Sequence, residues 1–314
     1  NMMTLMNITK AGVYSQSGPI KGIKKRNCER ISLIPSWFAQ TQSWKTVRMF
    51  ERSVSGNESK SLSFLDPVSC LMSSTSFAGE TNIRDGGKSD TSGSSNRLRQ
   101  LSLGVIDAAA MITKTKIKRF CLSELRNMPL YVYNTDSHSV LHRELEGLQL
   151  KNYTASEFLP GISKSGTIVK GVRHEDLQKT SFADNFFDII ISSEVFEHIP
   201  KPYQAFAEVY RILKPGGAHV FTVPYVADSP SDINMSFLNP EGIVIDGPGR
   251  PPDFIPPFFH SDSFRSEGII VFTIFSEEIL TRLCKLGFDV EIKVIQNENL
   301  GIVGLGSIIF TAWK

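Results

Sequence analysis

Long hydrophobic runs, paired cysteines and a strong charge are all missing from this 314-residue sequence. No apolar run approaches the roughly 18–20 residues that a membrane-spanning helix needs, so we expect no membrane span. The formal net charge of +2 gives no whole-protein reason to expect a nucleic acid partner. The four cysteines are scattered without a C-x-x-C pair, so we expect free or buried thiols, no metal site and a cytoplasmic location.

The first 99 residues differ in composition from the rest of the chain. A basic stretch from Lys10 to Arg52 is followed by residues 53–98, which are rich in Ser, Gly, Asn and Asp. Neither stretch is periodic, and such a chain buries too little apolar surface to offset the entropy lost when it is ordered. We therefore expect a low-complexity or loosely ordered extension over residues 1–99. A targeting segment and a tether to an anionic surface are the alternatives.

The centre of the sequence carries the strongest pattern, a strand, a helix and a second strand. Apolar runs at residues 187–191 and 218–223 are typical of buried parallel strands. Between them, residues 202–213 place apolar side chains at helical spacing, and the sequence KPGG at residues 214–217 ends the helix. Such a unit predicts two neighbouring parallel strands with a ligand site beyond their carboxyl ends.

Further elements complete a large sheet around this unit. Helices are expected within 96–126, 139–148 and 276–286, and strands at 130–133, 153–158, 167–173, 288–295 and 307–313. These elements predict an α/β fold with a doubly wound, mostly parallel, seven-stranded sheet and an antiparallel last strand. We place this domain at residues 100–314, with its core at 129–314 and an insertion at 226–274. An insertion of this length is typical of lids and binding loops.

The motif FDIIISSEVFEHI at residues 187–199, followed by RILKPGG and FTVP, resembles the core of one enzyme family. This family is the class I, Rossmann-like S-adenosylmethionine-dependent methyltransferases. The resemblance covers about residues 129–314. It implies S-adenosylmethionine as the cofactor and methyl transfer to an acceptor, for which a small molecule or a sugar hydroxyl is our preference.

The first turn of the sheet departs from the usual pattern of this family. Most members carry a glycine-rich turn after the first strand, whereas this chain has Asn134-Thr135-Asp136-Ser137 there. The chain is therefore similar to a subset with a glycine-poor first turn. The N-terminus of the helix that follows offers free amides to the carboxylate of the cofactor. We expect Asn134, Thr135 and Ser137 to add further contacts.

Four other positions are expected to bind the remainder of the cofactor. Glu157 lies about twenty residues past the first turn, where an acidic residue accepts hydrogen bonds from ribose hydroxyls. The resemblance implies that Asp176 and Leu177 contact the adenine, and that Glu194 faces the amino or sulfonium group. An exposed surface role for Glu157 and a turn-forming role for Asp176 are the alternatives.

His198 and His260 are the candidate catalytic residues. His198 follows Glu197 at the predicted edge of the sheet, and a Glu–His pair suits a general base toward a hydroxyl or an amine. His260 lies near the middle of the insertion and is a candidate for an acceptor contact or a base. Shaping of the pocket by His198 and a packed surface position for His260 are the alternatives.

Two other functions compete with an active methyltransferase. A catalytically inactive, methyltransferase-like binding or scaffold protein is supported by the missing glycine-rich turn. A nicotinamide-dependent enzyme fits less well, because it also needs that turn and does not share the E-H-I and K-P-G-G motifs.

Overall fold

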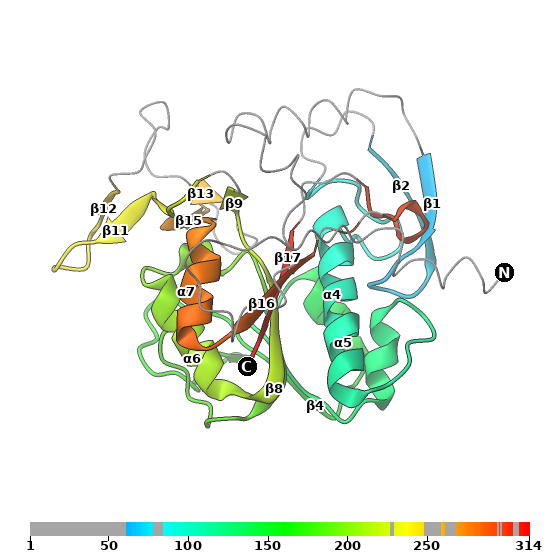
Figure 1. Ribbon diagram of the computed structural model, residues 1–314, viewed down its shortest axis with the longest axis horizontal. Coiled ribbons are helices and arrows are strands. Elements are labelled where there is room, and N and C mark those ends of the chain that lie inside the picture. Colours follow the sequence, from blue (N-terminus) through cyan, green and yellow to red (C-terminus); the bar gives the residue numbers. More distant parts are fainter. Residues whose placement is uncertain are drawn as a thin grey trace.

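The computed structural model places two layers of helices on opposite faces of a central sheet (Figure 1). Helices α4 (Asn96–Thr113) and α5 (Val140–Gly147) cover one face, and α6 (Pro202–Ile212) and α7 (Glu278–Leu286) cover the other. The structure describes residues 61–77, 84–226, 229–247, 268–293, 295, 297–303 and 308–314, and the backbone of 259–260. Among these residues, none of the helices combines the length and the hydropathy of a membrane-spanning segment.

The central sheet has the strand order β16-β17-β8-β7-β3-β4. Its strands are β3 (Tyr131–Asn134), β4 (Asn152–Ala155), β7 (Phe187–Ser193), β8 (Leu213–Thr222), β16 (Asp289–Lys293) and β17 (Ile309–Trp313). The neighbours among β4, β3, β7 and β8 are parallel, whereas β17 is antiparallel to both β8 and β16. The predicted doubly wound, mostly parallel sheet with an antiparallel last strand is thereby confirmed.

The predicted third strand takes a different form. It splits into a small antiparallel hairpin of β5 (Ile168–Val169) and β6 (Val172–Arg173). Lys170 and Gly171 form its turn and both have positive φ, which is typical of two-residue hairpin turns. Within the described part of the chain, one isolated parallel bridge, between Glu157 and His174, continues the order of the sheet beyond β4. The central sheet therefore has six strands among the described residues, one fewer than predicted.

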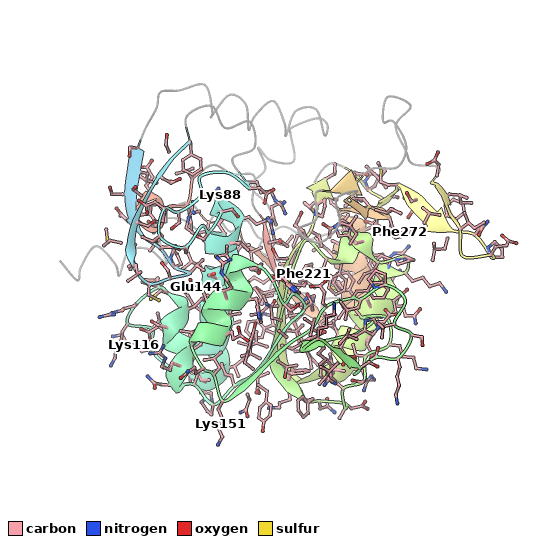
Figure 2. The ribbon with its side chains drawn as sticks, turned by 180° about the vertical axis from the view of Figure 1, so that it is seen from behind. Lys88, Lys116, Glu144, Lys151, Phe221 and Phe272 are labelled. Atoms are coloured by element: carbon pink, nitrogen blue, oxygen red, sulfur yellow. The ribbon has the colours of Figure 1, made fainter. Side chains whose placement is uncertain are left out.

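The strand–helix–strand unit forms the centre of the fold. The KPGG sequence, which was expected only to end α6, also belongs to β8, which begins at Leu213. Gly216 has φ +78°, and a Cβ on Gly217 would lie 2.9 Å from the carbonyl oxygen of Asp188. Glycine is therefore required where the chain enters the sheet. Phe221 of β8 is fully buried and lies in the interior of the molecule (Figure 2).

Residues 61–77 and 84–95, which we expected to be loosely ordered, form defined structure. Strands β1 (Ser61–Leu65) and β2 (Met72–Ser76) make an antiparallel hairpin. Phe64 of this hairpin is buried, and its ring lies under the guanidinium of Arg99. The central guanidinium carbon is 4.8 Å from the ring centroid. The serines that made this region resemble low-complexity sequence donate hydrogen bonds to the buried Asp66 carboxylate, as Ser92 and Ser94 show. Residues 1–60 lie outside the described part of the chain.

Short elements connect and extend these layers. The 3-10 helices are η1 (Leu122–Asn127), η2 (Phe196–His198) and η3 (Glu298–Leu300). The insertion and its flanks contain β9 (Tyr225–Val226), β10 (Ile233–Asn234), β11 (Ser236–Leu238), β12 (Val244–Asp246), β13 (Phe259–His260), β14 (Ile269–Ile270) and β15 (Thr273–Ser276). Strands β11 and β12 form a hairpin that extends away from the helical layers (Figure 1).

Candidate functional site

The carboxyl ends of β4, β3 and β7 meet at one edge of the sheet. The amide of Thr135, just past β3, donates to the carbonyl of Ile191 in β7 at 3.0 Å. The amide of Ser156, just past β4, donates to the carbonyl of Asn134 at 3.1 Å. The predicted first turn, Glu157 and Glu194 therefore follow neighbouring parallel strands, as the strand–helix–strand pattern required.

The first turn is held by its own side chains. The Asp136 carboxylate accepts hydrogen bonds from the amides of His138 and Ser139, at 2.8 and 3.0 Å. The Ser139 hydroxyl then accepts from the amide of His142 at 3.2 Å and caps α5. The Asn134 side-chain amide donates to the Asp136 carbonyl at 2.8 Å. Several amides that we expected to be open to a cofactor carboxylate are therefore used within the turn, because Asp and Ser readily cap a helix start.

Thr135 is the exception within this turn. Its side chain is buried, and its hydroxyl has no hydrogen-bond partner among the described residues. A buried polar atom without a partner costs folding free energy, so such atoms often lie where a ligand or a water binds. Ser137, by contrast, pairs its hydroxyl with Nδ1 of His138 at 2.7 Å. Thr135 is therefore the residue of the first turn that best fits a polar group of a bound cofactor.

Glu157 faces the first turn across the end of β4. Its carboxylate oxygen Oε2 lies 3.7 Å from Nδ1 of His138, and about a quarter of its side chain is exposed. Asp136, His138 and Glu157 each place one possible metal ligand within 4.8 Å of the others. Because the Asp136 oxygen already accepts two backbone amides, we assign no metal to this group.

Asp176 and Leu177 lie in the loop after the β5–β6 hairpin. The Asp176 carboxylate accepts a hydrogen bond from the amide of Gln178 at 2.9 Å, so it does form a turn. Leu177 is buried in the core on the α6 side. His174 is also buried, and its Nδ1 accepts from the amide of Leu159 at 2.9 Å, as expected for a structural histidine. The adenine contact stays a prediction.

At the end of β7, a distant segment pairs with Glu194. The two terminal guanidinium nitrogens of Arg84, Nη1 and Nη2, donate to Oε2 and Oε1 of Glu194, at 2.8 and 2.5 Å. Arg97 at the start of α4 donates to Asp85 at 2.6 Å and to the Ser193 hydroxyl. Glu194 itself has φ +55°, a conformation that non-glycine residues seldom adopt. Neither arginine was predicted as a site residue, because both lie within the stretch of residues 1–99 that resembled a loose extension, and no spacing linked them to the strand.

Two neighbouring carboxyl groups at this edge have opposite pKa shifts. Burial alone would raise the pKa of Glu194, but the charges of Arg84 and Arg97 hold that pKa below its usual value. Burial, and then the charge of Glu194, raise the pKa of Glu197 well above its usual value. Paired groups whose environments separate their pKa values in this way are common where protons are transferred.

His198 lies next to the carboxyl group of Glu197. Its Nδ1 donates to the carbonyl of Ile270 at 2.7 Å, because a carbonyl can only accept a hydrogen bond. The other ring nitrogen, Nε2, is 3.6 Å from Oε1 of Glu197. The ring is largely buried, with 10% of the side chain exposed.

The second predicted catalytic residue, His260, is described only in its backbone. That backbone pairs with Ile269 in the β13–β14 ladder, one residue from the Ile270 carbonyl that holds His198. The side chain of His260 lies outside the described residues, so its catalytic role stays a prediction. Tyr225 in β9, directly before the insertion, is buried, and its hydroxyl has no hydrogen-bond partner within the described part of the chain.

Residues 141–221 match the family model of a methyltransferase domain. The chain is 35% identical over 83 residues to a sterol 24-C-methyltransferase of Neurospora crassa, a match that covers 26% of this chain and 21% of that protein. It is 49% identical over 41 residues to an uncharacterized methyltransferase of Mycobacterium avium, covering 13% of this chain and 16% of that protein. The chain therefore spans between about a sixth and a fifth of the length of these curated relatives.

Among solved structures, the chain is similar to an S-adenosylmethionine-dependent methyltransferase of Mesorhizobium loti. The TM-score is 0.37 and the sequence identity 16%, over 59% of this chain and 91% of the other.

Proposed function

Since the chain carries a methyltransferase domain at residues 141–221, we propose that it is an S-adenosylmethionine-dependent methyltransferase acting on a small-molecule acceptor. The observation that carries this proposal is the position of the domain match. It covers β4, β7 and most of β8, and the polar residues of the candidate site follow β3, β4 and β7 at one edge of this sheet. Ligands of such sheets bind beyond the carboxyl ends of the strands.

The residues at this edge suit the three parts of the cofactor. The proposal assigns the ribose to Glu157 and the adenine to Asp176 and Leu177. The unpartnered hydroxyl of Thr135 supports a contact with the methionine end, where Asn134 and Ser137 shape the turn. When bound, S-adenosylmethionine supplies a methyl group activated by the positive charge on its sulfur.

Glu194 is assigned an electrostatic role at the same edge. Because Arg84 and Arg97 keep this buried carboxylate ionised, its negative charge persists near the sulfonium region of the proposed site. Both of its oxygens already accept hydrogen bonds from Arg84, so its effect on the cofactor acts through charge and through the backbone turn that it forms.

His198 is assigned the role of general base toward the acceptor. Its Nδ1 proton is held by the Ile270 carbonyl, so Nε2 is the nitrogen that takes a proton from an acceptor hydroxyl or amine. The Glu197 carboxyl lies 3.6 Å from Nε2, and because burial and the charge of Glu194 raise its pKa, it adjoins the ring mainly as a neutral acid. His260 and Tyr225 are assigned to the acceptor side of the site.

The acceptor is proposed to be a small molecule, with a sugar hydroxyl as one example. The sterol 24-C-methyltransferase names of two partial relatives support a small-molecule acceptor. Cys70 and Cys121 form no disulfide among the described residues, which supports the proposal of a cytoplasmic location.

A release assay tests this function. The purified chain is incubated with S-adenosylmethionine and a panel of sugars, sterols and other small hydroxyl compounds, and the S-adenosylhomocysteine formed is measured by mass spectrometry. We expect release with at least one acceptor, and a loss of about 100-fold in His198→Asn, consistent with removal of a general base. The exposed Glu146→Gln serves as a matched control. Failure of every acceptor, together with no binding of S-adenosylhomocysteine, would instead support a catalytically inactive binding protein.

A further inference from the structure

Two cysteine thiols meet where the N-terminal hairpin contacts the rest of the domain. Cys70 lies in the turn that joins β1 and β2, and Cys121 directly precedes η1. The Cys70 sulfur accepts a hydrogen bond from the amide of Ser123 at 3.4 Å, and the Cys121 sulfur is 3.4 Å from the Ser123 hydroxyl. The segments are also joined by the Leu122 amide, which donates to the Pro67 carbonyl at 2.8 Å. Both sulfur atoms therefore contact the same residue, Ser123.

The two thiols differ in reactivity. A hydrogen bond from the Cys121 thiol, with those from Ser123, lowers the pKa of Cys70 to about 6 even though burial opposes this shift. The same hydrogen bond and burial raise the pKa of Cys121. Cys70 is half-buried, whereas Cys121 is fully buried. An accessible thiolate beside a protected thiol is the arrangement of an attacking and a resolving cysteine.

The backbone fixes Cys70 in this position. Its φ is +65°, in the left-handed region that residues other than glycine seldom adopt. Its amide donates to the Asp66 carbonyl at 2.8 Å, and the Asp66 amide donates to the Leu71 carbonyl at 2.9 Å. The turn therefore presents the sulfur toward Ser123 and Cys121 instead of leaving it to rotate in solvent.

We propose that Cys70 and Cys121 form an oxidant-sensitive site at which a peroxide converts the two thiols to a disulfide. The Cys70 thiolate attacks one peroxide oxygen, and the O–O bond breaks to give a sulfenic acid and, after protonation, water. The Cys121 thiol then attacks the Cys70 sulfur, the S–S bond forms, and the sulfenic oxygen leaves as a second water. Two thiols lose two electrons in total, and hydrogen peroxide is reduced to two waters.

The disulfide has a structural consequence for the candidate site. It closes a loop of about 50 residues, and cross-links of that length stabilise the folded state by restricting the unfolded chain. This loop includes Arg84 and Arg97, the side chains that hold Glu194 and Ser193. Oxidation therefore cross-links the segment that carries these two arginines to the rest of the domain. The formation of the disulfide does not depend on the proposed function.

Peptide mapping of the full chain tests the proposal. The reduced protein is treated with hydrogen peroxide, remaining thiols are alkylated, and the protein is digested with trypsin without reductant. Cleavage after Lys60, Arg84, Arg119 and Arg126 places Cys70 and Cys121 on separate peptides, residues 61–84 and 120–126. We expect these two peptides as one species, two mass units lighter than their sum, and a thermal midpoint higher by about 5 °C than that of the reduced protein.

Two variants make the result decisive. Cys284→Ser removes the third described thiol and should give the same linked peptides and the same thermal shift. Cys70→Ser should abolish the linked peptides and the thermal shift. This variant changes a half-buried residue and leaves the fully buried Cys121 in place. The proposal is overturned if wild-type protein yields no linked peptides, or if Cys70 is oxidised no faster than Cys284.

Discussion

The first turn after β3 and the end of β7 lie at the same edge of the sheet but are stabilised in different ways. In the first turn, Asp136 and Ser139 accept amides that lie two or three residues further along the chain. At the end of β7, Glu194 is held by Arg84, which is 110 residues earlier in the sequence. One region is thus closed by local hydrogen bonds and the other by a long-range ion pair.

The two regions therefore contribute different features to the candidate site. The locally closed turn leaves one buried hydroxyl, that of Thr135, without a partner in the described residues. The end of β7 instead concentrates charge, with Glu194 ionised beside two arginines and Glu197 disfavoured as an anion. We interpret the first turn as a surface that contacts the ligand. We interpret the end of β7 as a region that acts through its charge.

The largest effect is expected from Arg84→Met, which leaves Glu194 buried without its cation. Breaking a buried ion pair on one side typically costs about 3 kcal/mol or more, so the free energy of unfolding in urea should fall by that amount. The double variant Arg84→Met/Glu194→Gln should recover most of this loss, because no charge is then left unpaired.

An exposed ion pair provides the control for Arg84. Arg282 and Glu278 lie one helical turn apart at 2.7 Å, and about half of the Arg282 side chain is exposed. Arg282→Met should therefore cost less than about 1 kcal/mol. Equal losses in Arg84→Met and Arg282→Met would contradict a buried pair at the end of β7.

A pH-dependent effect is expected from Glu197→Gln. The pKa of Glu197 is raised in the folded state, so its contribution to stability is present below about pH 4.5, the usual pKa of the group, and is lost as the pH rises through the folded pKa. Glutamine mimics the neutral acid and does not titrate. Urea unfolding is measured near pH 5 and near pH 8. The free energy of unfolding of the variant, relative to that of wild type, should be higher at pH 8 than at pH 5. A difference that does not change with pH would contradict the raised pKa.

The smallest effect is expected from Thr135→Val, which removes the unpartnered hydroxyl. Affinity for S-adenosylhomocysteine should fall by about 5- to 10-fold, the value of one hydrogen bond, while the folded protein is no less stable. Thr311 in β17 has an equally buried hydroxyl without a partner in the described residues, so Thr311→Val is a matched control. Calorimetric titration of both variants should show a loss for Thr135→Val only. Equal affinities in the two variants would contradict a contact at Thr135.

The sequence was sufficient to predict the main architecture, because apolar runs and helical periodicity depend on neighbouring residues. The strand–helix–strand unit around α6 formed as expected, and residues 141–221, which hold its motifs, match the model of a methyltransferase domain. Helix α7 and the two last strands are also close to their predicted bounds.

The parts that were not predicted depend on distant contacts or on single backbone angles. Strand 167–173 became a hairpin because Lys170 joined Gly171 in a positive-φ turn. The serine-rich segment before α4 became ordered because its hydroxyl groups surround Asp66, and composition alone does not indicate such a partner. For the same reason, the pairing of Arg84 with Glu194 could not be inferred from spacing.

The most direct measurement is isothermal titration of the full chain with S-adenosylhomocysteine, repeated on Glu157→Gln. Our account predicts micromolar binding by wild type and a loss of at least about 10-fold in Glu157→Gln, since a charged hydrogen bond to ribose would be removed. Glu146→Gln on the exposed side of α5 should bind as wild type does. Absence of heat and of any thermal shift at millimolar ligand would contradict the cofactor site, and with it the central claim that this edge of the sheet binds S-adenosylmethionine.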